Sequence, residues 1–160
     1  MTGPREAAAP PPDATIAALR RLLLAILLFG MIGTATELIL IEHDEDLWQW
    51  IPIVLLAAGV LASGALLAAG SRAARGLTRG FRAVMVLLIL SGGLGSVLHF
   101  QANREFKLEM DPSLRGFALF SSVIRAKTPP SLAPGTMVLL GLVGLASAFR
   151  REVPRPSGNS

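Results

Sequence analysis

Two ionisable side chains, Glu37 and His99, lie inside apolar stretches of the sequence. A titratable group is costly there, and it usually has a role. Each follows a similar pattern, Gly-x-x-Gly and then Thr or Ser, whose spacing places the glycines, the hydroxyl and the ionisable group on one helix face. The spacing therefore predicts two narrow faces of small residues, each with one titratable group near its end. The small residues are Gly30, Gly33 and Thr34 in the first pattern and Gly92, Gly95 and Ser96 in the second.

Three interpretations of this pair are open. Glu37 and His99 form an interhelical hydrogen bond that fixes helix register, or they bind a metal ion or a polar ligand, or they relay protons or ions. Imidazole and carboxylate suit zinc, manganese or iron, but no ligand pair here has a diagnostic spacing. The residues that we expect to support the pair are Thr34, Ser96, His43, Asn103 and Glu105.

Composition limits the class of protein. The chain has 160 residues, of which 52% are hydrophobic, and its mean hydropathy is +0.57. Its net charge of +4 comes from basic residues in short segments beside apolar runs, which is the pattern of a membrane protein and not of a nucleic-acid-binding surface. The chain has no cysteine, and its sequence contains no phosphate loop, hydrolase serine elbow or zincin motif. We therefore expect neither an enzyme nor a bound cofactor.

Four apolar runs are long enough to cross a bilayer. The first has 20 residues between Arg21 and Glu42, with Glu37 as its only charge, and these cover ~30 Å as a helix. The sequence therefore predicts an all-α, four-span helical bundle over residues 13–150, with Pro-rich flexible tails at 1–12 and 151–160. The predicted spans are 16–41, 48–70, 83–102 and 132–149.

The first run has an alternative interpretation. Arg20-Arg21, the apolar run and Gly33-Thr34-Ala35 have the order of the three regions of a cleavable signal peptide. The run continues to Ile41, however, and three further runs follow, which favours a membrane span.

The distribution of Lys and Arg predicts the orientation. Residues 1–21, 71–82 and 150–160 together hold ten of these side chains, whereas residues 42–47 and 103–131 hold five. Loops on the cytoplasmic side carry the excess. We therefore expect a protein of the bacterial inner membrane with both termini in the cytoplasm.

The link between the third and fourth spans contains a predicted short amphipathic helix over residues 112–126, in the outer loop. Asp111 and Pro112 are suited to the N-cap and the first helical position. Leu114, Phe117 and Ile124 follow at helical spacing. The helix is either an ordinary connection or a lid or partner surface.

The two halves of the chain resemble each other. At an offset of 62 residues Arg20 matches Arg82 and Glu37 matches His99, and Pro52 matches Pro134 at a different offset. Two duplicated helical hairpins would produce this pattern, whereas the abundance of glycine favours chance. In either case small residues are expected to let helices pack closely. The glycines that we expect to pack helices are Gly30, Gly33, Gly92, Gly95, Gly59 and Gly141.

The last third of the chain also carries two characteristic stretches. They read Asn103-Arg104-Glu105-Phe106-Lys107-Leu108-Glu109-Met110-Asp111-Pro112 and Thr128-Pro129-Pro130-Ser131-Leu132-Ala133-Pro134-Gly135-Thr136-Met137. This region resembles a group of small four-span bacterial integral membrane proteins with no assigned activity. The resemblance implies the same architecture and carries over no functional residues.

The sequence thus predicts a small multi-pass membrane protein without enzymatic activity. We expect a structural or accessory subunit that lies in the lipid bilayer and associates with copies of itself or with other membrane proteins, and not with nucleic acid. The alternative is a small transporter, channel or metal- or ligand-binding membrane protein that uses Glu37 and His99.

Overall fold

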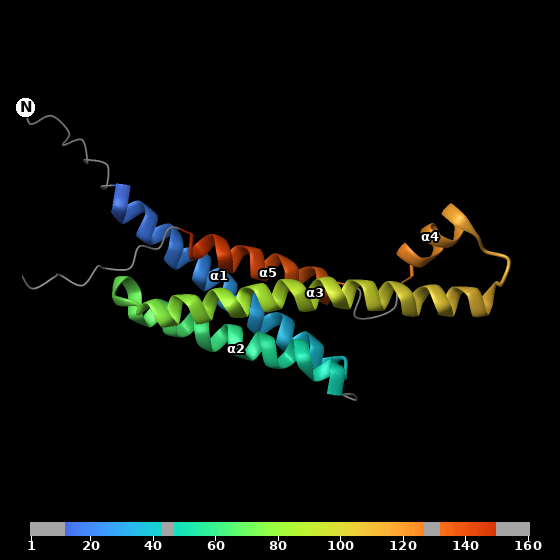
Figure 1. Ribbon diagram of the computed structural model, residues 1–160, viewed down its shortest axis with the longest axis horizontal. Helices are drawn as coiled ribbons and strands as arrows, with labels where there is room; N and C mark the ends of the chain where they lie inside the picture. The colour runs from blue at the N-terminus through green and yellow to red at the C-terminus, as the bar shows by residue number, and fades with distance from the viewer. Residues whose placement is uncertain (1–11, 43–46, 127–131, 150–160) are drawn as a thin grey trace, which may run out of the picture.

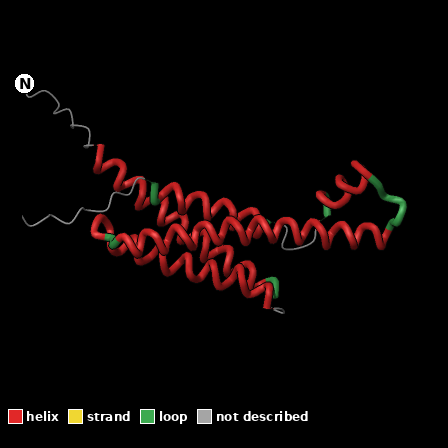
Figure 2. Tube along the Cα trace, in the orientation of Figure 1, coloured by secondary structure: helices red, strands yellow, loops and turns green. Residues whose placement is uncertain are grey.

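The computed structural model describes residues 12–42, 47–126 and 132–149, and over these ranges the chain is helical, with no strand (Figures 1 and 2). Except for Pro12, the predicted tails lie outside the described residues. The elements are α1 (Pro12–Leu40), α2 (Leu47–Ala69), the short 3-10 helix η1 (Gly70–Arg72), α3 (Arg75–Met110), α4 (Gly116–Ile124) and α5 (Ala133–Ser147).

Among the described residues, α1, α2 and α3 are long and apolar enough to cross a membrane, whereas α5 has only 15 residues. The helix α3 has 36 residues and is therefore ~54 Å long, well beyond the ~30 Å of a hydrocarbon core. The predicted third span, 83–102, is only the middle of this helix. The expected link does not begin at residue 103, because the polar stretch that follows contains no helix-breaking residue before Asp111-Pro112.

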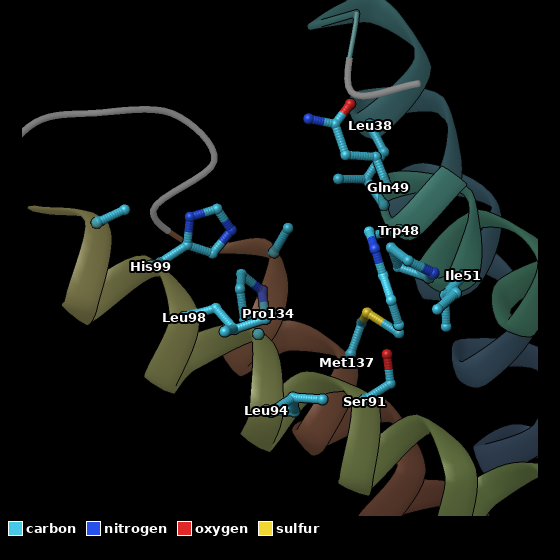
Figure 3. Close-up of a pocket in the computed structure, with 14 residues that line it drawn as sticks. Leu38, Trp48, Gln49, Ile51, Ser91, Leu94, Leu98, His99, Pro134 and Met137 are labelled. Carbon is cyan, nitrogen blue, oxygen red and sulfur yellow. The ribbon is translucent and has the colours of Figure 1, made fainter. Parts of the chain in front are cut away.

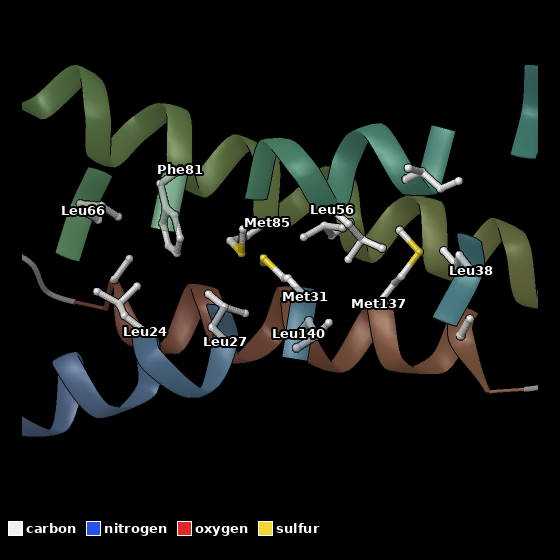
Figure 4. Packing of buried hydrophobic residues seen from close by; sticks show 14 of the residues in the cluster. Leu24, Leu27, Met31, Leu38, Leu56, Leu66, Phe81, Met85, Met137 and Leu140 are labelled. Atoms are coloured by element: carbon white, nitrogen blue, oxygen red, sulfur yellow. The ribbon is translucent and has the colours of Figure 1, made fainter. Parts of the chain in front are cut away.

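Four helices form a ring. The helix α1 packs against α2 and α5, and α3 packs against the same two helices, while α1 and α3 are not neighbours and neither are α2 and α5. Side chains from all four helices fill the centre, as Figure 4 shows. We call the end of the bundle near Arg20 and Arg82 the arginine end, and the end near Trp48 and His99 the histidine end. The most deeply buried side chains include Leu27, Met31, Leu56, Phe81, Met85 and Leu88.

Glycines set the distances between the helices. A Cβ on Gly92 would meet the backbone oxygen of Pro134, and one on Gly141 would lie 2.7 Å from the backbone oxygen of Met85, so α3 and α5 touch backbone to backbone. Gly30 lies against Leu140 of α5.

The other predicted packing glycines differ among themselves. Gly59 lies against Met31 of α1, and Gly95 makes ordinary contact with Pro134. Gly33 has open space where a Cβ would lie, so it takes no part in packing within the described chain.

The offset of the predicted duplication does not match the positions that are buried on α1 and α3. Leu24, Leu27 and Met31 are buried on α1, and Met85 and Leu88 are buried on α3. These positions correspond at an offset of 61 residues, not 62. Because consecutive residues differ by about 100° around a helix, residues paired at an offset of 62 face different directions. The duplication itself stays a prediction.

The predicted outer helix is shorter than expected, because Asp111 does not cap its N-terminus. The carboxylate of Asp111 instead accepts hydrogen bonds from the hydroxyl and the backbone N–H of Ser113, at 2.6 and 3.0 Å, directly after the end of α3. These two bonds lower the pKa of Asp111. The resulting turn keeps residues 112–115 out of the helix, so α4 begins at Gly116, which has a φ of +52°.

We predict that Gly92→Ala destabilises the bundle by about 1–3 kcal/mol, because the new methyl group would push α5 away from α3. Chemical unfolding of the protein in detergent micelles, followed by circular dichroism, measures this change. Gly93→Ala is the matched control, because Gly93 has open space at its Cβ position and should lose no stability. Equal destabilisation by both variants would contradict the close α3–α5 contact.

Candidate functional site

The structure separates the two predicted site residues. Glu37 is exposed on α1, whereas His99 is half-buried on α3 and lines a pocket to which Glu37 does not contribute. The two helices are not neighbours in the ring. Within one chain, therefore, Glu37 and His99 belong to two different surfaces.

The pocket at the histidine end has a volume of about 370 Å³ (Figure 3). Its walls come from the start of α2, the middle of α3 and the start of α5, with Leu38 of α1 beside them. Leu38, Ala133, Pro134 and Met137 are buried, while Trp48 and Leu98 at the rim are well exposed. The remaining lining residues are Gln49, Ile51, Pro52, Ser91, Leu94, Gly95, His99, Ala102 and Pro134.

The pocket exists because the bundle opens toward this end. Gly30 and Gly144 hold α1 and α3 close to α5 in the part of the bundle nearer the arginine end. Toward the histidine end the α1–α2 hairpin diverges from α3 and α5, as Figure 1 shows. Pro52 and Pro134, which the sequence comparison pairs, both line the resulting gap, from α2 and α5 respectively. Neither ring can donate a backbone hydrogen bond, so both contribute mainly apolar surface.

The expected supporting residues are dispersed. Thr34 is buried in the bundle, and the Ser96 hydroxyl donates a 2.9 Å hydrogen bond to the Gly92 carbonyl of its own helix. Asn103 is half-buried and Glu105 is exposed on the part of α3 that extends beyond the pocket. His43 lies outside the described residues.

Metal binding receives no support from the described part of the chain. No group of three or more His, Asp or Glu side chains lies close enough together there to hold an ion. Glu37 and His99 alone would supply two ligands at most, on surfaces that do not meet, whereas protein zinc sites use three or four protein ligands.

Two arginines have a role that the sequence analysis did not predict. Arg20 of α1 donates to the backbone oxygen of Phe149 at 2.9 Å, and Arg82 of α3 donates to that of Ala148 at 2.6 Å. Carbonyl groups at the C-terminus of a helix lack intrahelical partners and attract cations. The two residues match in the offset-62 comparison, but that comparison gave no indication that both would contact α5.

No protein-family model, curated protein or solved structure matches the chain. Two surfaces of the described chain are candidates for a function: the outward face of α1 around Glu37 and the apolar pocket beside His99.

We predict that Glu37→Gln and His99→Ala act independently on stability, with a coupling energy below about 0.5 kcal/mol, because the residues lie on different surfaces of two helices whose backbones are not neighbours. A double-mutant cycle of unfolding in detergent measures it under conditions that keep the protein monomeric. Phe100→Leu with Phe120→Leu is the positive control, since these rings lie 6.0 Å apart and should couple by about 0.5–1.5 kcal/mol. A Glu37–His99 coupling as large as that control would show that the two side chains interact within one chain.

Proposed function

We propose that the chain is a non-enzymatic subunit of a membrane assembly and that the outward face of α1 contacts a second membrane protein. The observation that carries this proposal is the position of Glu37, which is exposed on a helix of membrane-spanning length and composition. A carboxylate in hydrocarbon costs about 2.5–3.5 kcal/mol at mid-membrane, less toward the end of a span. A hydrogen-bond donor on a neighbouring helix would remove this cost.

The surface around Glu37 suits a close helix contact. Phe29, Gly33 and Glu37 follow at four-residue spacing and so share one face of α1. Phe29 is 82% exposed, and Gly33 has open space where a side chain would lie. Glycine allows two backbones to approach, and a buried polar side chain one turn away adds a hydrogen bond between the helices. This face therefore combines the two features that hold membrane helices together.

We further propose that α5 is a fourth crossing. It packs between α1 and α3, and its last carbonyls meet arginines of both helices at one end of the bundle. Four crossings put both termini on the same side, and the excess of Lys and Arg on that side supports a cytoplasmic location in a bacterial inner membrane. The resemblance of the last third of the chain to small four-span proteins agrees with this count.

The alternative of a transporter or channel built on Glu37 and His99 would need a second copy of the chain. Only another protomer could place a Glu37 next to a His99 that lines the pocket of the first. The same self-association would therefore be required, and proteoliposomes would then show an ion flux that Glu37→Gln abolishes.

We predict that the wild-type protein is recovered from mild detergent with a second copy or with another membrane protein and that Gly33→Leu reduces this recovery at least tenfold. A leucine side chain would keep the helices apart at the proposed contact. Native mass spectrometry of the complex measures the recovery. Glu37→Gln should have a smaller effect, because an amide can still form hydrogen bonds.

Gly93→Leu is the control for this experiment, because it adds the same bulk to an equally open glycine on α3. A wild-type protein that remains monomeric and unaccompanied in both detergent and lipid nanodiscs would overturn the proposal. So would equal losses from Gly33→Leu and Gly93→Leu.

A further inference from the structure

The pocket at the histidine end has the chemistry of a site for an apolar chain. Of its fourteen lining residues, only Trp48, Gln49, Ser91 and His99 have side chains that form hydrogen bonds. Its buried lining residues, Leu38, Ala133, Pro134 and Met137, are all apolar. Its volume of about 370 Å³ lies within the ~300–1,000 Å³ of sites that bind small molecules.

The shape of the pocket suits one extended, flexible apolar chain. The lining residues on α3 extend from Ser91 to Ala102, a distance of ~16 Å along the helix axis. A pocket that follows a membrane-spanning helix over this length lies parallel to the lipid acyl chains beside it.

Three of the four polar residues mark the end at which a headgroup would lie, whereas Ser91 lies at the other end. His99 on α3 and Gln49 on α2 lie near the open end of the bundle, and Trp48, 80% exposed, is next to Gln49 on the opposite wall from His99. Tryptophan is typical of the level of the headgroups. Farther along α3, Asn103 and Lys107 follow His99 at four-residue spacing, so the three residues share one face of the helix. Beyond the bundle this face therefore carries the amide of Asn103 and the cationic side chain of Lys107.

We propose that this pocket binds one acyl chain of a membrane phospholipid, with the phosphate of that lipid near His99 and the Lys107 side of α3. The terminal methyl of the chain would lie near Ser91 and Met137, at the opposite end of the pocket from Gln49. The side chains exposed at the rim, such as Leu94 and Leu98, would allow the lipid to enter sideways from the bilayer. The pocket does not include Glu37 or Gly33, so this site and the proposed contact on α1 succeed or fail separately.

The test uses the full-length protein in nanodiscs that contain a phospholipid with a photoreactive diazirine near the end of one acyl chain. After irradiation, mass spectrometry locates the labelled residues. We expect labelling to concentrate on Ser91 and Met137, at least fivefold above the lipid-facing Ile26 and Ile32, which are 52% and 53% exposed on α1. Even labelling of these four positions would overturn the proposal.

A pair of variants tests whether the pocket itself is responsible. Ala102→Trp would place an indole at the exposed rim and should reduce labelling of Met137 at least fivefold, whereas Gln101→Trp adds the same group on another face of α3 and should change it less than twofold. Circular dichroism confirms that both variants remain helical. Equal labelling in the two variants would contradict binding in the pocket.

A separate experiment tests whether the phospholipid headgroup contributes to binding. A free fatty acid carrying the same diazirine should label Met137 less than the phospholipid does, and His99→Ala with Lys107→Ala should reduce this difference. If the fatty acid labels Met137 and the phospholipid does not, the proposed phospholipid is wrong and the ligand is a single-chain amphiphile.

Discussion

The backbone contact between α3 and α5 is the interaction on which the rest of the bundle depends. In lipid, apolar side chains gain little by leaving their surroundings, so helices associate chiefly through close packing and hydrogen bonds. Gly92 and Gly141 allow the two backbones to meet, and Arg82 binds a carbonyl at the end of α5. With only 15 residues, α5 keeps its position through these contacts, and α1 then packs on its other side.

The histidine end differs because the close packing there joins α3 to α5, through Gly92, Gly95 and Pro134, and does not include α2. Gly59 brings α2 against Met31, and Gly144 lies against Leu27 and Met85, but no such contact joins α2 to α5. The starts of these two helices instead present Pro52 and Pro134 to the gap between them. The pocket is therefore a consequence of where the glycines lie along the helices.

The helical fold and the positions of α1 and α2 could be predicted from the sequence, because runs of uncharged residues identify segments that suit hydrocarbon. The length of α3 could not. A change from apolar to charged residues at Arg104 marks the edge of the apolar run, but a helix continues through it when no residue breaks it. The turn at Asp111 was also missed, because aspartate before proline favours an N-cap and a turn about equally.

The structure places Glu37 and His99 on different surfaces of one chain. The sequence could not show this, because a helix that is apolar on all sides gives little indication of which side faces a neighbour. The sequence repeat aligns at an offset of 62 residues, whereas the buried faces of α1 and α3 align at an offset of 61. One residue corresponds to about 100° around a helix, so the sequence alignment pairs residues that face different directions. Glycines indicated the packed sides of α3 and α5, since Gly92 and Gly141 lie at the α3–α5 contact, but Gly33 of α1 faces outward.

The extension of α3 connects the pocket with α4. The Asp111 turn reverses the chain, and α4 then lies back against α3, with the ring of Phe120 6.0 Å from that of Phe100. Phe100 is the residue after His99, so α4 lies near the level at which the pocket opens. Phe117, 82% exposed, and Ile124, 62% exposed, also lie on α4 and present apolar surface there. At the depth of the headgroups such a helix would rest on the bilayer, which would place the rim of the pocket where a lipid can reach it.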